Sequence, residues 1–282
     1  MTDRIWRCRD HILPLGSRTL VMGVVNVTPD SFSDGGLFAD AKAAVAHAAR
    51  LVDEGADIVD IGGESTRPGA EAVPLDDELH RVVPVVEGIR AARPDVVISV
   101  DTRHPDVAAE AVAAGAAIVN DISGGADPGT LRVAADGKTG LVLMHMQGEP
   151  GSMQAAPRYD DVVGEVHEYL RERVEAALFA GLAAEQLCVD PGIGFGKTLE
   201  HNLALLRALD RFRDLDAGLL IGVSRKRFIG ALTGVEAPQD RLEGSLAGAV
   251  LAAAAGADVV RVHDVRATVR ALQVADAVTR NP

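Results

Sequence analysis

Short apolar runs recur along most of the chain, and longer segments with helical periodicity separate them. The first run begins at Met22 and gives way at Asn26 to a polar, glycine-rich stretch that ends at Gly36. Further runs follow at residues 58–61, 96–100, 117–119, 141–144, 187–189, 219–223 and 259–262. The first run has β-branched and aliphatic residues without polar side chains, and the others are mostly aliphatic, as is typical of strands buried on both faces. The pattern therefore predicts eight buried strands.

The segments between these strands carry apolar residues three and four positions apart, as one face of an α-helix requires. In residues 39–54 they include Ala44, Ala48 and Leu51, and Gly55 follows as a residue suited to end a helix. The same reasoning predicts helices at 75–92, 105–114, 128–135, 160–180, 199–209, 244–255 and 265–278. Each predicted strand is thus followed by a predicted helix.

Strands that are separated by helical crossovers form parallel sheets. Eight such units without a dinucleotide-binding fingerprint favour the α/β class and, within it, a closed (β/α)8 barrel, the TIM barrel, over an open sheet. No linker or shift in composition divides the chain, so we expect one domain over residues 1–282. Residues 1–19, with Pro14 and Gly16, predict a short hairpin that leads into the barrel.

Composition narrows the class of protein. The formal net charge of −13 argues against a nucleic-acid surface, because phosphate backbones are bound by clustered Lys and Arg. The most apolar tract, residues 244–257, is too short to span a bilayer, and the charged segment 1–10 is no signal peptide. Cys8 and Cys188 lie far apart without metal or redox spacing. We expect a soluble cytoplasmic protein with no nucleic-acid or membrane partner.

Every predicted strand ends in polar or glycine-rich residues. In a parallel barrel these ends meet at one mouth, where active sites are found. A single Asp after a strand is often only a helix cap, but capping explains poorly why all eight strands end in this way. The pattern therefore predicts an active site at the C-terminal ends of the strands. The residues concerned are Asn26, Gly62, Gly63, Asp101, Asn120, His145, Asp190, Ser224, Lys226 and His263.

Two chemical groups can be distinguished among the residues at the mouth. Asp101, Asn120 and Asp190 offer hydrogen-bond acceptors, which suit a flat ligand rich in N–H groups, such as an aminopyrimidinone. The other group is basic, and cations that meet at one rim of so acidic a chain indicate an anionic substrate. Its members are Arg67, Lys226, Arg261 and His263.

One segment imitates a nucleotide-binding loop. Residues 192–198 read GIGFGKT, but Pro191 stands where a P-loop needs glycine, and Lys197 stands where the dinucleotide fingerprint needs glycine. We interpret the segment as a turn that covers a ligand, with Phe195 as a stacking face. His145, between two methionines, fits a core position and a pocket wall equally well. Ser224 lacks the context of a hydrolase nucleophile, and no Cys/His cluster has zinc spacing.

Long segments of the chain resemble the dihydropteroate synthase family. They are residues 22–36, 62–70, 99–102, 120–121, 190–197, 224–226 and 261–264, in the family's order. The resemblance implies a TIM-barrel transferase of folate biosynthesis. Such an enzyme joins 4-aminobenzoate to 6-hydroxymethyl-7,8-dihydropterin diphosphate and releases 7,8-dihydropteroate and diphosphate.

The resemblance also implies roles for individual residues. The pterin would be bound by Asp101, Asn120, Asp190 and Lys226, with Ile122, Met144, Phe195 and Gly222 as walls. The diphosphate would contact Asn26, Arg67, Arg261 and His263, with Asn26 also holding Mg²⁺. The 4-aminobenzoate would lie near Phe32, Thr66, Pro68, Ser224 and Lys226. The residues expected to act in catalysis are Asp101, Lys226 and Asn26.

The expected reaction needs no nucleophile, because diphosphate is already a good leaving group, and an SN1-like route follows as a hypothesis. Family resemblance further implies a homodimer and competitive inhibition by sulfonamides. The loops at residues 27–37 and 65–72 are rich in Gly, Pro and Ser, and their polar residues have a partner only when diphosphate is bound. We therefore expect the pterin diphosphate to bind before 4-aminobenzoate. Two alternatives stay open. One is a catalytically silent paralogue that binds pterin. The other is a barrel of the methyltetrahydrofolate–corrinoid methyltransferase type, which would have no use for a diphosphate rim.

Overall fold

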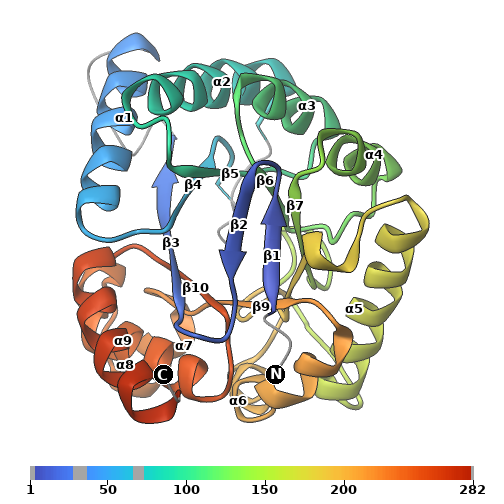
Figure 1. Cartoon of the computed structure of the whole chain (residues 1–282). Coiled ribbons are helices and arrows are strands. Elements are labelled where there is room, and N and C mark those ends of the chain that lie inside the picture. The colour runs from blue at the N-terminus through green and yellow to red at the C-terminus, as the bar shows by residue number, and fades with distance from the viewer. Residues whose placement is uncertain (1–3, 28–36, 66–72, 281–282) are drawn as a thin grey trace.

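The computed structural model describes residues 4–27, 37–65 and 73–280, with the backbone alone for residues 37–40. Eight parallel strands close into a barrel in the order β10-β3-β4-β5-β6-β7-β8-β9, and helices surround it (Figure 1). The predicted (β/α)8 barrel is therefore confirmed. In this described part of the chain, no helix combines the length and the apolar character that crossing a membrane requires.

The barrel strands are short and almost wholly buried, as their aliphatic sequences require. They are β3 (Leu20–Asn26), β4 (Ile58–Gly62), β5 (Val97–Asp101), β6 (Ile118–Asp121), β7 (Gly140–Met144), β8 (Leu187–Asp190), β9 (Gly218–Gly222) and β10 (Val259–Val262). Their register aligns the predicted site positions, because Asn26 lies beside Gly62, Gly62 beside Asp101, and Asp101 beside Asn120. Four consecutive strands thus present polar or glycine positions side by side at, or one residue before, their ends.

The helices lie where the apolar periodicity predicts them, with ends shifted by no more than a few residues. They are α1 (Leu37–Asp53), α2 (Leu75–Ala92), α3 (Pro105–Ala114), α4 (Pro128–Gly137), α5 (Val162–Phe179), α6 (Leu199–Arg207), α8 (Leu242–Ala254) and α9 (Val265–Thr279). A further helix, α7 (Arg227–Thr233), was not predicted. Its seven residues are too few to show a helical period.

The N-terminal hairpin is confirmed, as β1 (Ile5–Cys8) and β2 (His11–Pro14), and it closes one end of the barrel. Trp6 is fully buried among barrel-interior residues such as Met22 and Ile118, and its indole Nε1 donates to the Gln186 carbonyl at 2.9 Å. A side chain at Gly140 would meet Cys8 Sγ at 2.7 Å, so the hairpin packs tightly. This plug was not foreseen from the sequence.

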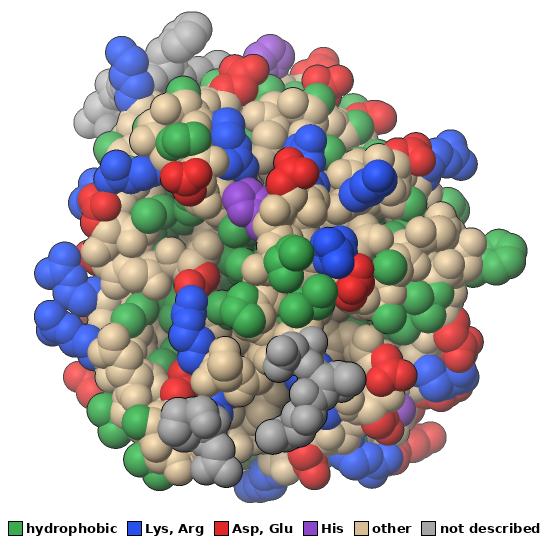
Figure 2. All heavy atoms as spheres, in the orientation of Figure 1, with side chains coloured by type: hydrophobic (Ala, Val, Ile, Leu, Met, Phe, Trp, Pro, Cys, Tyr) green, Lys and Arg blue, Asp and Glu red, His purple; other side chains and the backbone are tan. Residues whose placement is uncertain are grey.

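The hairpin crosses the barrel on the face that Figure 1 presents. Figure 2, in the same orientation, shows acidic and basic side chains interspersed over this closed end. The bonds that fix the hairpin lead to N-terminal strand positions, for instance from Arg4 to Asp258, which precedes β10. The opposite end of the barrel, where the strands terminate, is therefore the one that can receive a ligand.

Candidate active site at the C-terminal ends of the strands

A buried ion-pair network spans the mouth of the barrel. The guanidinium of Arg261 on β10 donates from Nε to Asp60 Oδ2 and from Nη2 to Asp101 Oδ2, each at 2.6 Å. The Asn120 amide donates from Nδ2 to the same Asp60 oxygen at 3.1 Å. The structure thus brings together three of the predicted site residues, from β5, β6 and β10.

Asp60 is the member of this network that the sequence reasoning missed. It lies inside the apolar run of β4 and is fully buried. A carboxylate in a buried strand needs a charged or hydrogen-bonding partner, so its presence there was a usable signal. The network explains why Asp60 is tolerated in a buried strand. Its carboxylate accepts hydrogen bonds from Arg261 and Asn120.

Two acceptor atoms in the network have no partner among the described residues. They are Asp60 Oδ1 and Asp101 Oδ1, and both are buried. An unsatisfied buried acceptor is costly, by about 1–3 kcal/mol, unless a ligand or water supplies a donor. These oxygens suit a bound molecule with N–H groups, which agrees with the ligand class that the sequence predicts.

The pKa of Asp101 is raised to about 7. Burial raises it most, the positive charge of Arg261 opposes that rise, and the neighbouring Asp60 adds to it. For Arg261 itself, burial lowers the pKa, but Asp60 and Asp101 outweigh burial and leave it above its ordinary value. Arg261 therefore stays charged, while Asp101 can gain or lose a proton near neutral pH.

Asp190 and Lys226 form the other side of the mouth. Asp190 Oδ1 accepts from the Gly192 amide at 2.7 Å, and burial raises the pKa of Asp190 against the opposing charge of Lys226. The Lys226 ammonium donates to the Ile193 carbonyl and lies 4.7 Å from the centre of the Phe195 ring. Burial lowers the pKa of Lys226 to about 8, and Asp190 opposes that change.

The predicted wall residues border these groups. Met144 pairs with Asp190 in the sheet, and Ile122, which directly follows β6, is buried like Met144. At Gly222 an added Cβ would lie 3.6 Å from Lys226 Nζ and 3.8 Å from Arg261 Cβ. A larger residue at position 222 would therefore fill the space between the two cations.

Side-chain donors hold residues 192–198, the segment that resembles a nucleotide-binding loop, through hydrogen bonds to its backbone carbonyl groups. Gly194 O accepts from Gln154 Nε2 at 2.6 Å, Phe195 O from Lys197 Nζ at 3.0 Å, and Gly196 O from the Tyr159 hydroxyl at 2.9 Å. Lys197 is almost fully buried, so it is not placed to bind a phosphate in solution. These contacts hold the segment as a turn, and its role in covering a ligand with Phe195 stays a prediction.

Lys197 also settles the position of His145. Lys197 Nζ lies 2.9 Å from His145 Nδ1 and 3.4 Å from the His145 carbonyl. The imidazole packs edge-on against Tyr169, with ring centres 4.9 Å apart. Burial, and then the charge of Lys197, lowers the pKa of His145 to about 3, so it is neutral. His145 belongs to the packing behind the turn.

Ser224 and His263 meet where β9 and β10 end. Ser224 is buried, its Oγ accepts from the backbone amide of His263 at 3.2 Å, and His263 Nδ1 lies 3.0 Å from the same oxygen. Asn26 ends β3 and is half-buried. Phe32, Thr66, Arg67 and Pro68 lie outside the described residues, so their predicted roles stay predictions.

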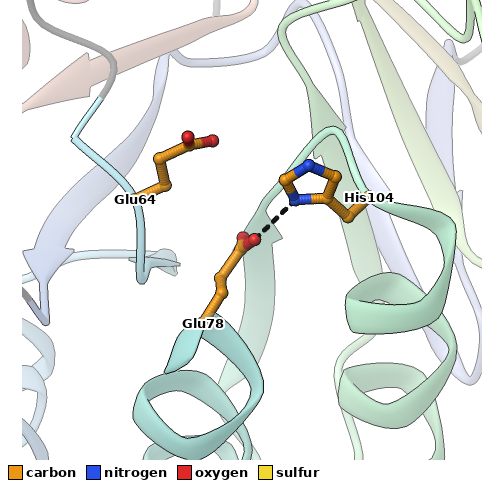
Figure 3. Close-up of side chains that lie close together, drawn as sticks. All are labelled: Glu64, Glu78 and His104. Carbon is orange, nitrogen blue, oxygen red and sulfur yellow. Dashed lines mark hydrogen bonds and ion pairs between the residues drawn. The ribbon is translucent and has the colours of Figure 1, made fainter. Parts of the chain in front are cut away.

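One acidic group near the mouth could be mistaken for a metal site. Glu64, Glu78 and His104 offer ligand atoms within 4.8 Å of one another, from the loops after β4 and β5 and from α2 (Figure 3). However, Arg103 binds Glu64 through Nε at 3.2 Å and Nη2 at 3.3 Å, and His104 Nδ1 lies 2.7 Å from Glu78 Oε2. Glu64 and one oxygen of Glu78 thus have partners, whereas Glu78 Oε1 has none among the described residues. We interpret the cluster as a link between α2 and the loops after β4 and β5.

The fold and the site together define a barrel enzyme of the pterin-binding class. Residues 22–263 match the family model described as "Pterin binding enzyme". The chain is 52% identical over 257 residues to dihydropteroate synthase of Escherichia coli K12, covering 91% of this chain and 90% of that protein. It is 46% identical over 261 residues to dihydropteroate synthase of Bacillus subtilis, covering 92% and 88%. The chain belongs to the dihydropteroate synthase family.

Solved structures agree with this assignment. Xanthomonas albilineans dihydropteroate synthase with 4-aminobenzoic acid superposes with a TM-score of 0.92 at 52% identity and full coverage of both chains. The Yersinia pestis enzyme with a sulfonamide drug gives 0.90 at 47% identity, covering 97% and 98%. The Burkholderia cenocepacia enzyme with 7,8-dihydropteroate gives 0.88 at 46% identity, covering 98% and 96%.

Proposed function

We propose that this protein is a transferase that condenses 6-hydroxymethyl-7,8-dihydropterin diphosphate with 4-aminobenzoate, forming 7,8-dihydropteroate and diphosphate. The observation that carries the proposal is the buried network of Asp60, Asp101 and Arg261, with two unpartnered carboxylate oxygens beside it. Family membership supports the same reaction, because the match to relatives named dihydropteroate synthase covers 90% and 88% of their length. A folate-pathway enzyme would work in the cytoplasm, which stays a prediction.

Pterin recognition follows from the acceptors at the mouth. The dihydropterin is flat and carries several N–H groups along one edge, and carboxylates accept such groups in parallel pairs. Asp101, Asn120 and Asp190 would bind that edge, and Lys226 would bind a ring acceptor. Phe195, Ile122 and Met144 would contact the ring faces. An analogue without the N–H groups would leave buried acceptors unpaired, which is a strong basis for selectivity.

The chemical step breaks the bond between the pterin methylene carbon and the diphosphate oxygen, and the electron pair leaves with diphosphate. The resulting cation is delocalised into the dihydropterin ring, where Asp60, Asp101 and Asp190 stabilise positive charge. The aromatic amine of 4-aminobenzoate then forms the C–N bond, and the proton that it loses passes to the released diphosphate or to water. We infer this dissociative, SN1-like order because the mouth offers charge stabilisation and no activated nucleophile among the described residues.

Departing diphosphate needs positive charge, which Arg261 and His263 would supply together with Arg67. The oxygen of Asn26 is a hard ligand of the type that Mg²⁺ accepts, and Mg²⁺ usually combines one or two protein ligands with substrate phosphates. Bound there with the substrate, Mg²⁺ would neutralise the diphosphate. Ser224 and Lys226, with Phe32, Thr66 and Pro68, would bind 4-aminobenzoate, the molecule that sulfonamides resemble.

A homodimer is consistent with the outer surface. Leu251 on α8 is 69% exposed, and Val274 and Val278 on the neighbouring α9 are 67% and 79% exposed. Exposed aliphatic side chains on adjacent helices mark interaction surfaces. We propose that these helices contribute to a contact between two copies, which sedimentation equilibrium would check.

Turnover is the direct test of the proposed function. The purified protein, given both substrates and Mg²⁺, should release diphosphate and form 7,8-dihydropteroate. Binding of the pterin diphosphate without turnover would indicate the catalytically silent alternative. Methyl transfer from methyltetrahydrofolate to a corrinoid, without condensation, would indicate the methyltransferase alternative.

A further inference from the structure

Two parallel side-chain links join the loop after β9 to the loop after β10. The inner link is the contact between Ser224 and His263. The outer link connects the next residue on each loop, Arg225 and Asp264. The Arg225 guanidinium donates from Nε to Asp264 Oδ2 at 3.0 Å and from Nη2 to Asp264 Oδ1 at 2.6 Å. Such a bidentate pair fixes orientation as well as distance.

Arg225 has an unusual backbone conformation. Its φ is +59°, in the left-handed region that residues with a side chain rarely adopt. This conformation turns the chain sharply between Ser224 and Lys226, which both belong to the proposed binding site. A residue is held in such a conformation only where its surroundings determine it.

Hydrogen bonds to the backbone of Arg225, as well as those of its side chain, hold it in this conformation. The Arg225 amide donates to Ser245 Oγ at 2.9 Å, and the Arg225 carbonyl accepts from Arg241 Nη1 at 2.9 Å. Together with the pair to Asp264, these bonds tie the turn to α8 and to the loop that carries His263. The turn is thus fixed from both sides.

We propose that Arg225 and Asp264 are positioning residues, which hold Ser224 and His263 in the arrangement that binds 4-aminobenzoate and diphosphate. The inference rests on the proposed function, because it assigns the pair a purpose in that reaction. The pair itself is partly exposed, with side-chain exposures of 31% for Arg225 and 25% for Asp264. Partly exposed pairs add little to folding stability, so loss of the pair should affect binding geometry more than folding.

The test uses three variants of the full-length protein. Arg225→Lys keeps the charge but not the fork, Asp264→Asn removes the charge, and the double variant Arg225→Asp with Asp264→Arg reverses the pair. Both single variants should raise KM for the pterin diphosphate and for 4-aminobenzoate about ten-fold, since misplaced binding groups lose contact with the substrate. Binding of 6-hydroxymethyl-7,8-dihydropterin, which has no diphosphate, should stay within about two-fold of wild type. Lys226, which belongs to the proposed pterin pocket, is held separately by the Ile193 carbonyl. The reversed pair should recover most of the loss.

A matched control lies at the other end of the barrel. Arg18 also forms a bidentate pair, with Asp57, at 2.8 and 2.5 Å. Arg18→Lys should leave both KM values unchanged, because that pair borders no proposed binding residue. Melting temperatures of all variants should remain close to wild type.

The outcomes distinguish a failure of the positioning role from a failure of the proposed function. If the wild type is active and the single variants keep its KM values, or if affinity for the bare hydroxymethylpterin falls equally, the positioning role is refuted while the proposed function stands. If the wild type binds the pterin diphosphate without turnover, the proposed function fails, and calorimetric titration of that ligand into the same variants decides on the pair. Failure of the reversed pair to recover any affinity would also overturn the inference.

Discussion

At the scale of single residues, Asp60 organises the site through one oxygen and leaves the other to a ligand. Asp60 Oδ2 accepts from Arg261 and Asn120, whereas Oδ1 has no partner among the described residues. Asp60→Asn preserves the shape but places an amide N–H₂ where Oδ1 stands. That group cannot accept N–H bonds, so pterin binding should weaken by about 1–3 kcal/mol.

Calorimetry with 6-hydroxymethylpterin measures this loss directly. A melting curve of the same variant separates a change in binding from a change in folding. Wild-type affinity in a folded Asp60→Asn variant would show that the unpartnered oxygen does not face the ligand.

Two residues of the site should control its pH dependence. Burial raises the pKa of Asp101 to about 7 and lowers the pKa of Lys226 to about 8. The proposed binding mode needs Asp101 as a carboxylate and Lys226 as an ammonium. Acidification through about pH 7 protonates Asp101, and a rise through about pH 8 removes the proton from Lys226, so kcat/KM should fall on both sides of a narrow maximum.

Arg keeps its charge far above this range, so Lys226→Arg provides the matched variant. Whatever its absolute rate, that variant should lose the alkaline decline and retain the acidic one. A wild-type profile that stays flat from about pH 6 to pH 9 would contradict the assignment of both groups.

At the scale of elements, a buried lysine, Lys197, joins the turn of residues 192–198 to His145. Lys197 Nζ contacts Phe195 O, His145 O and His145 Nδ1, three acceptors for the three protons of an ammonium group. Lys197→Met keeps the length of the side chain and removes all three bonds. It should free Phe195, and we expect pterin affinity to fall about ten-fold through a less ordered turn.

The burial of Lys197 also predicts in which direction the free energy of unfolding changes with pH. Burial lowers the pKa of Lys197 to about 7 from an ordinary value of 10.5. Between those values the unfolded chain binds more protons than the folded one, so this residue makes the free energy of unfolding rise with pH. The rise should therefore be steeper in wild type than in Lys197→Met when urea denaturation is compared at about pH 7 and pH 10. Equal slopes would mean that Lys197 is not buried as an ionisable group.

Elements were also what the sequence predicted best. Aliphatic runs and helical periods identify eight strands and eight of the helices, because burial on both faces and packing on one face impose these patterns directly. Helix α7 was missed because seven residues show no period. In the site, Asp101, Asn120, Asp190 and Arg261 could be found because they end strands or belong to recognisable motifs.

The residues that were missed act through contacts between distant segments. Asp60 looks like part of an ordinary strand until Arg261 is beside it, 201 positions later. The pair of Arg225 and Asp264 likewise joins two loops 39 positions apart. No local pattern encodes such a partner, since the closure of the barrel is what brings the segments together.

At the scale of the whole molecule, one end of the barrel contributes mainly to stability and the opposite end carries the proposed active site. The hairpin of β1 and β2 fills the end opposite the site, and Trp6 is the largest side chain fully buried in it. Trp6→Ala should destabilise the protein by about 3–5 kcal/mol, because it leaves a cavity among the interior residues. Trp6→Phe keeps most of the volume and loses the 2.9 Å bond to the Gln186 carbonyl, so its cost should be nearer 1–3 kcal/mol, the penalty for an unpaired buried acceptor.

Urea denaturation measures both changes, and steady-state kinetics at a temperature where all variants are folded measures their effect on the site. The folded fraction of each variant should keep the wild-type KM for both substrates, since the rigid strands separate the hairpin from the mouth and the network there makes no contact with it. A Trp6→Ala protein that is fully folded and yet binds the pterin diphosphate several-fold more weakly would contradict this separation. It would show that packing at the closed end determines the spacing of Asp60, Asp101 and Arg261 at the open end.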